Sequence, residues 1–381
     1  MIAIHSSWRK VNHIQAMLCL LLSFLPTSGI AQANPPNVED LVNSATAARE
    51  QNDLPRAIEL YRQIVKLDPQ WPDGWWFLGS LEYATNSYRE ARDAFTHYID
   101  LTPNAVPALA IRGLCEFETG DYSQSLKDIE RGLAFGAANQ PRNEIILRYH
   151  YALLLTKVGR FEDALKAFGL FVRDPDPKPE LLVAIGLAGL RQPLLPREVR
   201  SDQQELYAAA GKAAFDFMKG VPDTAREEFQ QLFERKPAVP NVHYLYGYLL
   251  YASDPDLAVI EFQRELEVNP SNPAAEVMLS WILLMQDRPA EALPHAEKAV
   301  AGNAGSAGAQ LVLGRAFTGT DDTRDGIDHL EKAAQLDPGN LEVHIALAKA
   351  YSKSGRKDDA RRERLLCLEI TKNETPLATH P

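Results

Sequence analysis

A small residue followed twelve positions later by a second small residue recurs nine times in this 381-residue chain, about every 34 residues. The sixth of these pairs is one residue shorter. Gly, Ala and Ser make up roughly a quarter of ordinary sequence, so chance agreement at all positions is on the order of one in 10^10. A period in the mid-thirties predicts paired helices stacked into a solenoid. The first members are Ala45, Gly79, Gly113, Ala152, Ala213, Gly247, Ser280, Gly314 and Ala348, and the second are Ala57, Ala91, Ser125, Ala164, Ala225, Ala258, Ala292, Gly326 and Ala360.

The spacing of these small residues has a physical cause, because two antiparallel helices approach closely only where the side chains at the crossing are small. Turn residues that tolerate positive φ lie between the members of six pairs: Asn52, Asn86, Gly120, Gly159, Gly220 and Gly355. Larger apolar residues follow the second small residue by four positions: Tyr61, Phe95, Ile129, Phe168, Phe229, Phe262 and Leu330. Prolines twelve positions after the second small residue predict the ends of the second helices: Pro69, Pro103, Pro237, Pro270 and Pro338.

The pattern resembles the tetratricopeptide repeat, most closely at Trp75, Leu78, Gly79, Tyr83, Asn86, Tyr88, Ala91, Phe95 and Pro103. The resemblance implies an all-α solenoid, a right-handed superhelix of antiparallel helix pairs, and a chain that holds partner proteins. It places nine units at 38–71, 72–105, 106–139, 145–178, 206–239, 240–272, 273–306, 307–340 and 341–370. Ala296, Gly326 and Arg364 depart from the pattern, so we expect looser packing in the last units.

The array is interrupted once. Residues 179–192 continue the register of a further first helix, but Pro193 and Pro196 follow where a second helix would begin. One interpretation is four units with a capping helix at 38–192, a hinge or linker at 193–205, five units at 206–370 and a disordered tail at 371–381. The other is a decayed tenth repeat inside one continuous superhelix.

The N-terminus predicts export. Arg9 and Lys10 precede an apolar run, Ala16–Leu25, which Pro26 ends and an Ala-Gln-Ala sequence at 31–33 follows. This succession is typical of a cleaved signal peptide at 1–33. The run is too short for the roughly twenty apolar residues of a membrane anchor, so we expect no stable membrane span and a periplasmic or extracellular location.

The net charge of the chain makes two classes of partner unfavourable. The net charge of −11 becomes −13 once Arg9 and Lys10 are removed, and such a negative charge disfavours nucleic acid or an anionic membrane as a partner.

Cys115 and Cys367 lie in the third and ninth units, too far apart in a solenoid for a disulfide, so both are predicted to be buried free thiols.

No sequence motif indicates catalysis or metal binding. The chain has no glycine-rich phosphate loop, no H-E-x-x-H, no paired CxxC and no G-x-S-x-G. The histidines after the signal segment are spread over different units. We therefore predict no enzyme, no cofactor and no metal site.

The resemblance implies a concave groove lined by positions five, nine and twelve of each first helix. Its candidate ligand residues are Trp76, Tyr83, Phe117, Tyr149, Phe217, Tyr244, Tyr248, Tyr251, Trp281, Arg315 and Lys349. The family's carboxylate-clamp pattern of Lys, Asn and Arg is absent. Packing between neighbouring first helices is the alternative for each ring, although the spacing of Tyr244, Tyr248 and Tyr251 places all three on one helix face.

These features predict an exported scaffold that binds an extended or helical protein segment in an aromatic groove, in an envelope assembly or secretion complex. The alternative is a polysaccharide-binding repeat domain of an envelope export machine, since sugars also stack on aromatic rings. Leucine, valine and alanine beside the rings favour a peptide.

The C-terminal helix predicts a further contact. Leu365, Leu366, Leu368 and Ile370 span several faces of one helix, so they cannot all turn inward. The sequence predicts an apolar strip there that is a homodimer contact or a partner-docking site, and exposed leucines that are merely tolerated are the alternative.

Overall fold

The computed structural model of the protein describes residues 37–103, 105–134 and 141–373, and helices are the only regular elements in that part. The predicted all-α solenoid is therefore confirmed. The predicted signal peptide and most of the predicted tail lie outside the described residues. None of the described helices is both long and apolar enough to span a bilayer. The chain divides between Val158 and Gly159 into two compact units, called unit 1 and unit 2 below.

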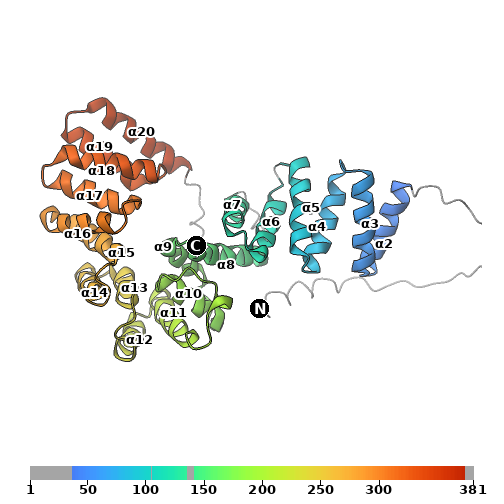
Figure 1. The fold of residues 1–381 in the computed structure, drawn as a ribbon, viewed down its shortest axis with the longest axis horizontal. Coiled ribbons are helices and arrows are strands. Elements are labelled where there is room, and N and C mark those ends of the chain that lie inside the picture. The colour runs from blue at the N-terminus through green and yellow to red at the C-terminus, as the bar shows by residue number, and fades with distance from the viewer. Residues whose placement is uncertain (1–36, 104, 135–140, 374–381) are drawn as a thin grey trace, which may run out of the picture. The chain divides into compact units, whose positions relative to one another are not determined.

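Unit 1 consists of consecutive helices that pack on their neighbours in chain order (Figure 1). These helices are α2 (Val38–Glu50), α3 (Leu54–Leu67), α4 (Pro72–Ala84), α5 (Tyr88–Leu101), α6 (Val106–Thr119), α7 (Tyr122–Ala134) and α8 (Pro141–Lys157).

Unit 2 continues in the same way from α9 (Phe161–Phe168), which a short 3-10 turn, η1 (Gly169–Phe171), follows. The next helices are α10 (Pro179–Gly189), α11 (Gln204–Lys219), α12 (Pro222–Arg235), α13 (Val242–Leu250), α14 (Pro255–Val268), α15 (Pro273–Met285) and α16 (Pro289–Gly302). The last are α17 (Ala307–Gly319), α18 (Thr323–Leu336), α19 (Leu341–Lys353) and α20 (Lys357–Asn373), and a 3-10 turn, η2 (Pro196–Glu198), lies between α10 and α11.

The helix ends lie where the turn residues and prolines predict them. The six residues expected at positive φ all have it, with φ from 60° at Asn52 to 87° at Gly120 and Gly220. The prolines at 69, 103, 237, 270 and 338 each stand two residues beyond the last residue of a second helix. At the C-terminus α20 continues to Asn373, three residues past the predicted end of the ninth unit.

Within a helix pair, the small residue of the first helix makes room for the large residue of the second. A methyl group added at Gly314 would lie 2.6 Å from Leu330, and one at Gly79 would lie 3.1 Å from the Phe95 ring. Leu330 and Phe95 are fully buried. Truncating such a core side chain to alanine costs about 3–5 kcal/mol, so this contact is a main source of stability in each pair.

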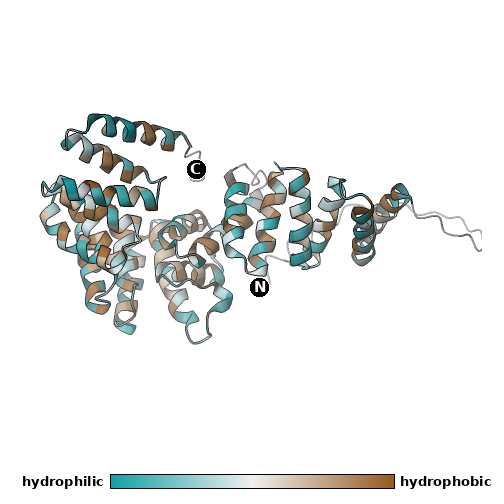
Figure 2. Ribbon diagram, turned by 45° about the horizontal axis from the view of Figure 1, so that its top comes forward, coloured by the Kyte–Doolittle hydropathy of each residue, from teal (hydrophilic) through white to brown (hydrophobic). Residues whose placement is uncertain are grey.

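Many of the helices, such as α3, α5, α7 and α18, also have one apolar and one polar face, and brown and teal residues alternate along single helices in Figure 2. Ser280 and Ala296 occupy the small and large positions of the α15–α16 pair, and both are fully buried. The Ser280 hydroxyl donates a hydrogen bond to the carbonyl of Ala292 at 3.2 Å. Smaller side chains therefore fill the interface between α15 and α16 than fill the interfaces of the neighbouring helix pairs.

Where the repeat pattern is interrupted, α10 packs closely against α11. A methyl group on Gly186 would lie 1.9 Å from the carbonyl oxygen of Tyr207, and one on Gly211 would lie 1.8 Å from that of Leu182. The segment between the two helices is anchored by Leu195, which is buried. Residues on both sides of the predicted linker at 193–205 are therefore in direct contact, while the two-block division stays a prediction.

We expect Gly211→Ala to lower the free energy of unfolding by about 2 kcal/mol or more, because the new methyl group meets backbone that cannot move aside. Gly339→Ala is the matched control, since nothing lies within 4 Å of the added Cβ there. Thermal unfolding of both variants measures the effect. Equal melting midpoints for Gly211→Ala and the wild type would show that the two helices are not in backbone contact.

Candidate functional site

Four of the predicted groove residues lie in unit 1: Trp76, Tyr83, Phe117 and Tyr149. Trp76 is half-buried, with its ring centroid 5.6 Å from Phe95 and 5.3 Å from Tyr98. Phe117 is buried, 4.8 Å from the His150 ring. The structure thus places Phe117 between helices, while the other three rings retain exposed area.

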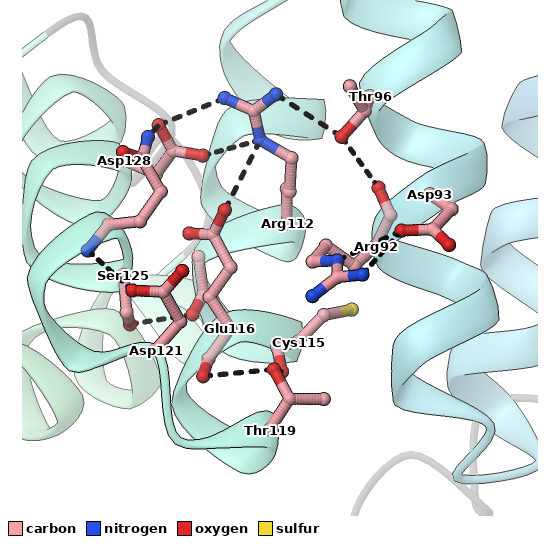
Figure 3. Close-up of polar contacts among 12 residues, drawn as sticks. Arg92, Asp93, Thr96, Arg112, Cys115, Glu116, Thr119, Asp121, Ser125 and Asp128 are labelled. Carbon is pink, nitrogen blue, oxygen red and sulfur yellow. Dashed lines mark hydrogen bonds and ion pairs between the residues drawn. The ribbon is translucent and has the colours of Figure 1, made fainter.

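A buried polar cluster that the sequence did not predict lies in unit 1, between α5, α6 and α7 (Figure 3). Arg112 of α6 donates two hydrogen bonds to the Asp128 carboxylate, at 2.6 and 3.1 Å, and a third to Thr96 at 3.4 Å. Glu116 stands one turn further along α6, with its Oε1 atom 3.8 Å from Arg112 Nε. Its buried Oε2 atom has no hydrogen-bond partner among the described residues.

Burial is the largest cause that raises the pKa of Glu116, to about 8, and the nearby Asp128 carboxylate adds to it against the opposing Arg112. Arg112 is already bound to Asp128, so its charge compensates Glu116 only in part. The Arg112–Asp128 pair joins α6 to α7 and holds unit 1 together, whereas Glu116, once ionised, is an incompletely compensated charge that lowers the stability of unit 1.

In unit 2, Tyr244 and Tyr248 of α13 and Tyr251, which directly follows that helix, lie on one face. The rings of Tyr244 and Tyr248 are parallel within 10° with centroids 6.4 Å apart, and those of Tyr248 and Tyr251 are 5.5 Å apart. Tyr248 and Tyr251 are half-buried. Tyr244 is only 3% exposed, so its ring packs beneath the surface that Tyr248 and Tyr251 form.

The hydroxyl of Tyr244 is already hydrogen-bonded. It donates to Glu162 of α9 at 2.6 Å and accepts from Arg191 at 3.3 Å, while Arg191 also pairs with Glu162. The Arg191 guanidinium stands 5.0 Å from both the Tyr244 and the Phe161 ring centroids. Burial is the main cause that raises the pKa of Tyr244 well above its usual value. This cluster joins residues 82 positions apart and fixes α13 against α9.

Trp281, Arg315 and Lys349 occupy the same position in three consecutive first helices, 34 residues apart, and are called the first-helix row below. The guanidinium of Arg315 lies 4.6 Å from the centroid of the Trp281 ring, and both side chains are half-buried. Lys349 is exposed and borders a hollow of about 360 Å³ with Ile345, Ala348, Arg364 and Cys367. Phe217 of α11 is half-buried.

Arg315 has no hydrogen bond or ion pair to any described residue. Burial lowers the pKa of its guanidinium, and the more distant Glu342 carboxylate opposes this only in part. Removing a cation from water without a carboxylate partner is unfavourable. Stacking on Trp281 compensates by about 0.5–2 kcal/mol at most. A desolvated, unpaired cation on the first-helix row is therefore suited to an anionic group of a ligand.

A polar pair that the repeat pattern did not predict joins the two helices of six helix pairs. In the last four, one member lies four residues before the first small residue and the other lies three after the second. This regular offset is the sequence signal from which these four polar pairs could have been predicted. The pairs are Arg112–Asp128, Lys212–Glu228, His243–Glu261, Glu276–His295, Gln310–His329 and His344–Glu363, with polar atoms 2.5 to 3.0 Å apart.

No group of three or more metal-ligating side chains occurs in the part of the chain that the structure describes. The two cysteines there are free thiols. Cys115 is buried as predicted, but Cys367 is half-buried, so the prediction of burial was wrong for Cys367.

Comparison with known protein families matches the tetratricopeptide repeat at residues 42–106, 248–307 and 317–363. The chain therefore carries tetratricopeptide repeats, and the described residues form a tetratricopeptide-repeat solenoid. An array of this kind is a scaffold suited to protein–protein interaction.

Individual relatives cover only part of the chain. "Protein CTR9 homolog" of Arabidopsis thaliana is 31% identical over 136 residues, which is 35% of this chain and 12% of that protein. The structure of MamA residues 41–end from Desulfovibrio magneticus RS-1 is 23% identical and covers 46% of this chain and 99% of its own, with a TM-score of 0.40. YrrB, described as a TPR protein with an unusual peptide-binding site, is 16% identical and covers 44% of this chain and 87% of its own, with a TM-score of 0.37.

The raised pKa of Glu116 predicts a pH-dependent stability. Between the usual pKa of 4.5 and the folded value of about 8, the folded state binds more protons than the unfolded state, so the free energy of unfolding falls as pH rises. Glu116→Gln removes this dependence. We expect the variant to be more stable than the wild type by about 2–4 kcal/mol above pH 8 and similar to it below pH 4.5.

Urea unfolding at a series of pH values between about 4 and 9 measures this difference, and Glu90→Gln on the exposed side of α5 is the control. Parallel pH profiles for Glu116→Gln and the wild type would mean that Glu116 is ionised in the folded state.

Proposed function

We propose that this chain is an exported scaffold that holds an extended or helical segment of another protein against the first helices of unit 2. The segment would place an acidic group at Arg315 and Lys349 and apolar or aromatic side chains at Trp281, Tyr248 and Tyr251. Such a scaffold would act in an envelope assembly or secretion complex. We propose no catalytic role and no nucleic acid partner.

The observation that carries this proposal is the state of Arg315. Its guanidinium is half-buried, stacks on Trp281 and has no carboxylate partner among the described residues. A carboxylate of a ligand would add a charge-assisted hydrogen bond in a partly desolvated place, where such bonds are strong. Lys349, at the same position one unit further, would add a second positive charge.

The aromatic residues supply the rest of the surface. Tyr248, Tyr251 and Trp281 are half-buried, so each ring keeps its orientation while part of its area stays accessible. Rigid aromatic rings give contact area at a low entropic cost and are common anchors at protein interfaces. Leu284, one turn after Trp281, is also half-buried and adds apolar area that suits a peptide better than a sugar.

Arg315→Gln tests the proposal most sharply, because a binding role and a structural role predict opposite outcomes. A binding role predicts that the variant loses affinity for the partner by about tenfold or more. It also predicts an unchanged or slightly higher melting temperature, since an uncompensated buried charge is removed. Trp281→Ala should weaken binding similarly but should also lower stability, because Trp281 packs against the buried hydrophobic cluster that contains Leu311 and Leu347.

The matched control is Arg264→Gln on α14, where the arginine pairs with Glu261 at 2.6 Å. Proteins from the native host that the wild type and Arg264→Gln retain, and Arg315→Gln does not, are identified by mass spectrometry and titrated calorimetrically. Unchanged affinity of Arg315→Gln would contradict the proposal. Retention of protease-resistant carbohydrate in place of protein would support the polysaccharide alternative.

Export rests on the charged, apolar and Ala-Gln-Ala succession at 1–33. We expect N-terminal sequencing of natively produced protein to find cleavage close to Ala33, and the mature chain to be recovered outside the cytoplasm. Soluble cytoplasmic protein that still begins at Met1 would overturn this part of the proposal.

A further inference from the structure

Two adjacent positions of α20 carry leucine where the two preceding second helices carry charged residues. Leu365 and Leu366 occupy the positions that Glu297 and Lys298 hold in α16, and that Glu331 and Lys332 hold in α18. Leu365 is 57% exposed and Leu368 is 61% exposed. Leu365 and Leu366 therefore differ from their counterparts in the preceding units, whereas Leu368 lies at a position that is also apolar in α16 and α18, as Val300 and Ala334. Figure 2 shows brown residues on this helix, the last one before the C label.

Charged side chains flank the leucines on the same face. At 3.6 residues per turn, Asp358, Arg361, Leu365, Leu368, Glu369 and Lys372 fall within an arc of about 100°. All six are exposed. None of the four charged ones has an ion pair to a described residue. Other charges of α20 do have partners: Glu363 binds His344, Arg364 binds Ser352, and Asp359 binds Arg356.

We propose that this face, called the α20 face below, binds the α20 face of a second copy of the chain in an antiparallel arrangement centred on Leu365. In that register Arg361 lies opposite Glu369 of the other copy, and Asp358 lies opposite Lys372. Two-fold symmetry repeats each pair, so four opposite-charge pairs flank one leucine contact.

Other registers do not give this match. A parallel pairing places Asp358 opposite Asp358 and Arg361 opposite Arg361. An antiparallel pairing shifted by three residues places Arg361 opposite Lys372. Like charges directly opposite are destabilising, so the charge pattern selects the register centred on Leu365. A contact of one helix per copy is small, which predicts a dimer that dissociates on dilution into the micromolar range.

This inference is independent of the proposed peptide binding, because the α20 face and the first-helix row consist of different residues. Sedimentation equilibrium of the purified, natively produced chain at increasing concentrations measures self-association directly. We expect a monomer–dimer equilibrium that Leu365→Glu shifts toward monomer by about 100-fold or more, since two glutamates then meet on the symmetry axis. Glutamate is the residue at this position in α16 and α18, so the variant should fold.

Leu336→Glu is the control, because Leu336 is a similarly exposed leucine on α18, outside the α20 face. It should leave the dissociation constant unchanged. The register is tested by charge reversal: Arg361→Glu and Glu369→Arg should each weaken the dimer, and the double variant should restore it, because the opposite charges then meet again.

A chain that remains monomeric at about 100 µM would overturn the proposal, because the proposed dimer should be populated at that concentration. A dimer that survives Leu365→Glu would place the contact elsewhere. Failure of the double charge reversal to restore a dimer that the single variants weaken would overturn the antiparallel register.

Discussion

The structure depends on one contact that repeats along the chain: a large apolar residue of a second helix fills the space left by a small residue about sixteen positions earlier. Phe95 against Gly79, Ile129 against Gly113, Phe262 against Gly247 and Leu330 against Gly314 are four instances. Each contact sets the distance between two helices and so the position of the next pair. Surface residues can then vary between units, because the array does not rely on them.

The fold could be predicted from sequence because its determinants are local. Small residues, turn residues and prolines recur at fixed offsets, and all lie within one helix pair. The close packing of Gly186 on Tyr207 and the bond from Tyr244 to Glu162 could not be predicted this way, since no period relates them. The polar pairs of the last four units could have been found, because their offsets are as regular as those of the small residues.

The candidate site was predicted less completely, and burial explains why. Helical spacing places Tyr244, Tyr248 and Tyr251 on one face, but it does not say how deep each residue lies, and Tyr244 is buried on Glu162 while the other two retain exposed area. Spacing also aligned Trp281 with Arg315 without indicating that no described carboxylate forms an ion pair with Arg315. The proposed preference for an acidic, partly apolar segment follows from this partly desolvated cation beside aromatic rings.

The central claim is that the first-helix row of unit 2 contacts a protein segment in the native host. Site-specific photo-crosslinking tests it most directly, with a photoreactive residue at position 281 and, as a comparison, at the exposed Ile260 of α14. The account predicts a covalent adduct with one protein at position 281, at a segment that contains acidic residues, and none at position 260. Equal adducts at both positions, or adducts only at 260, would contradict it.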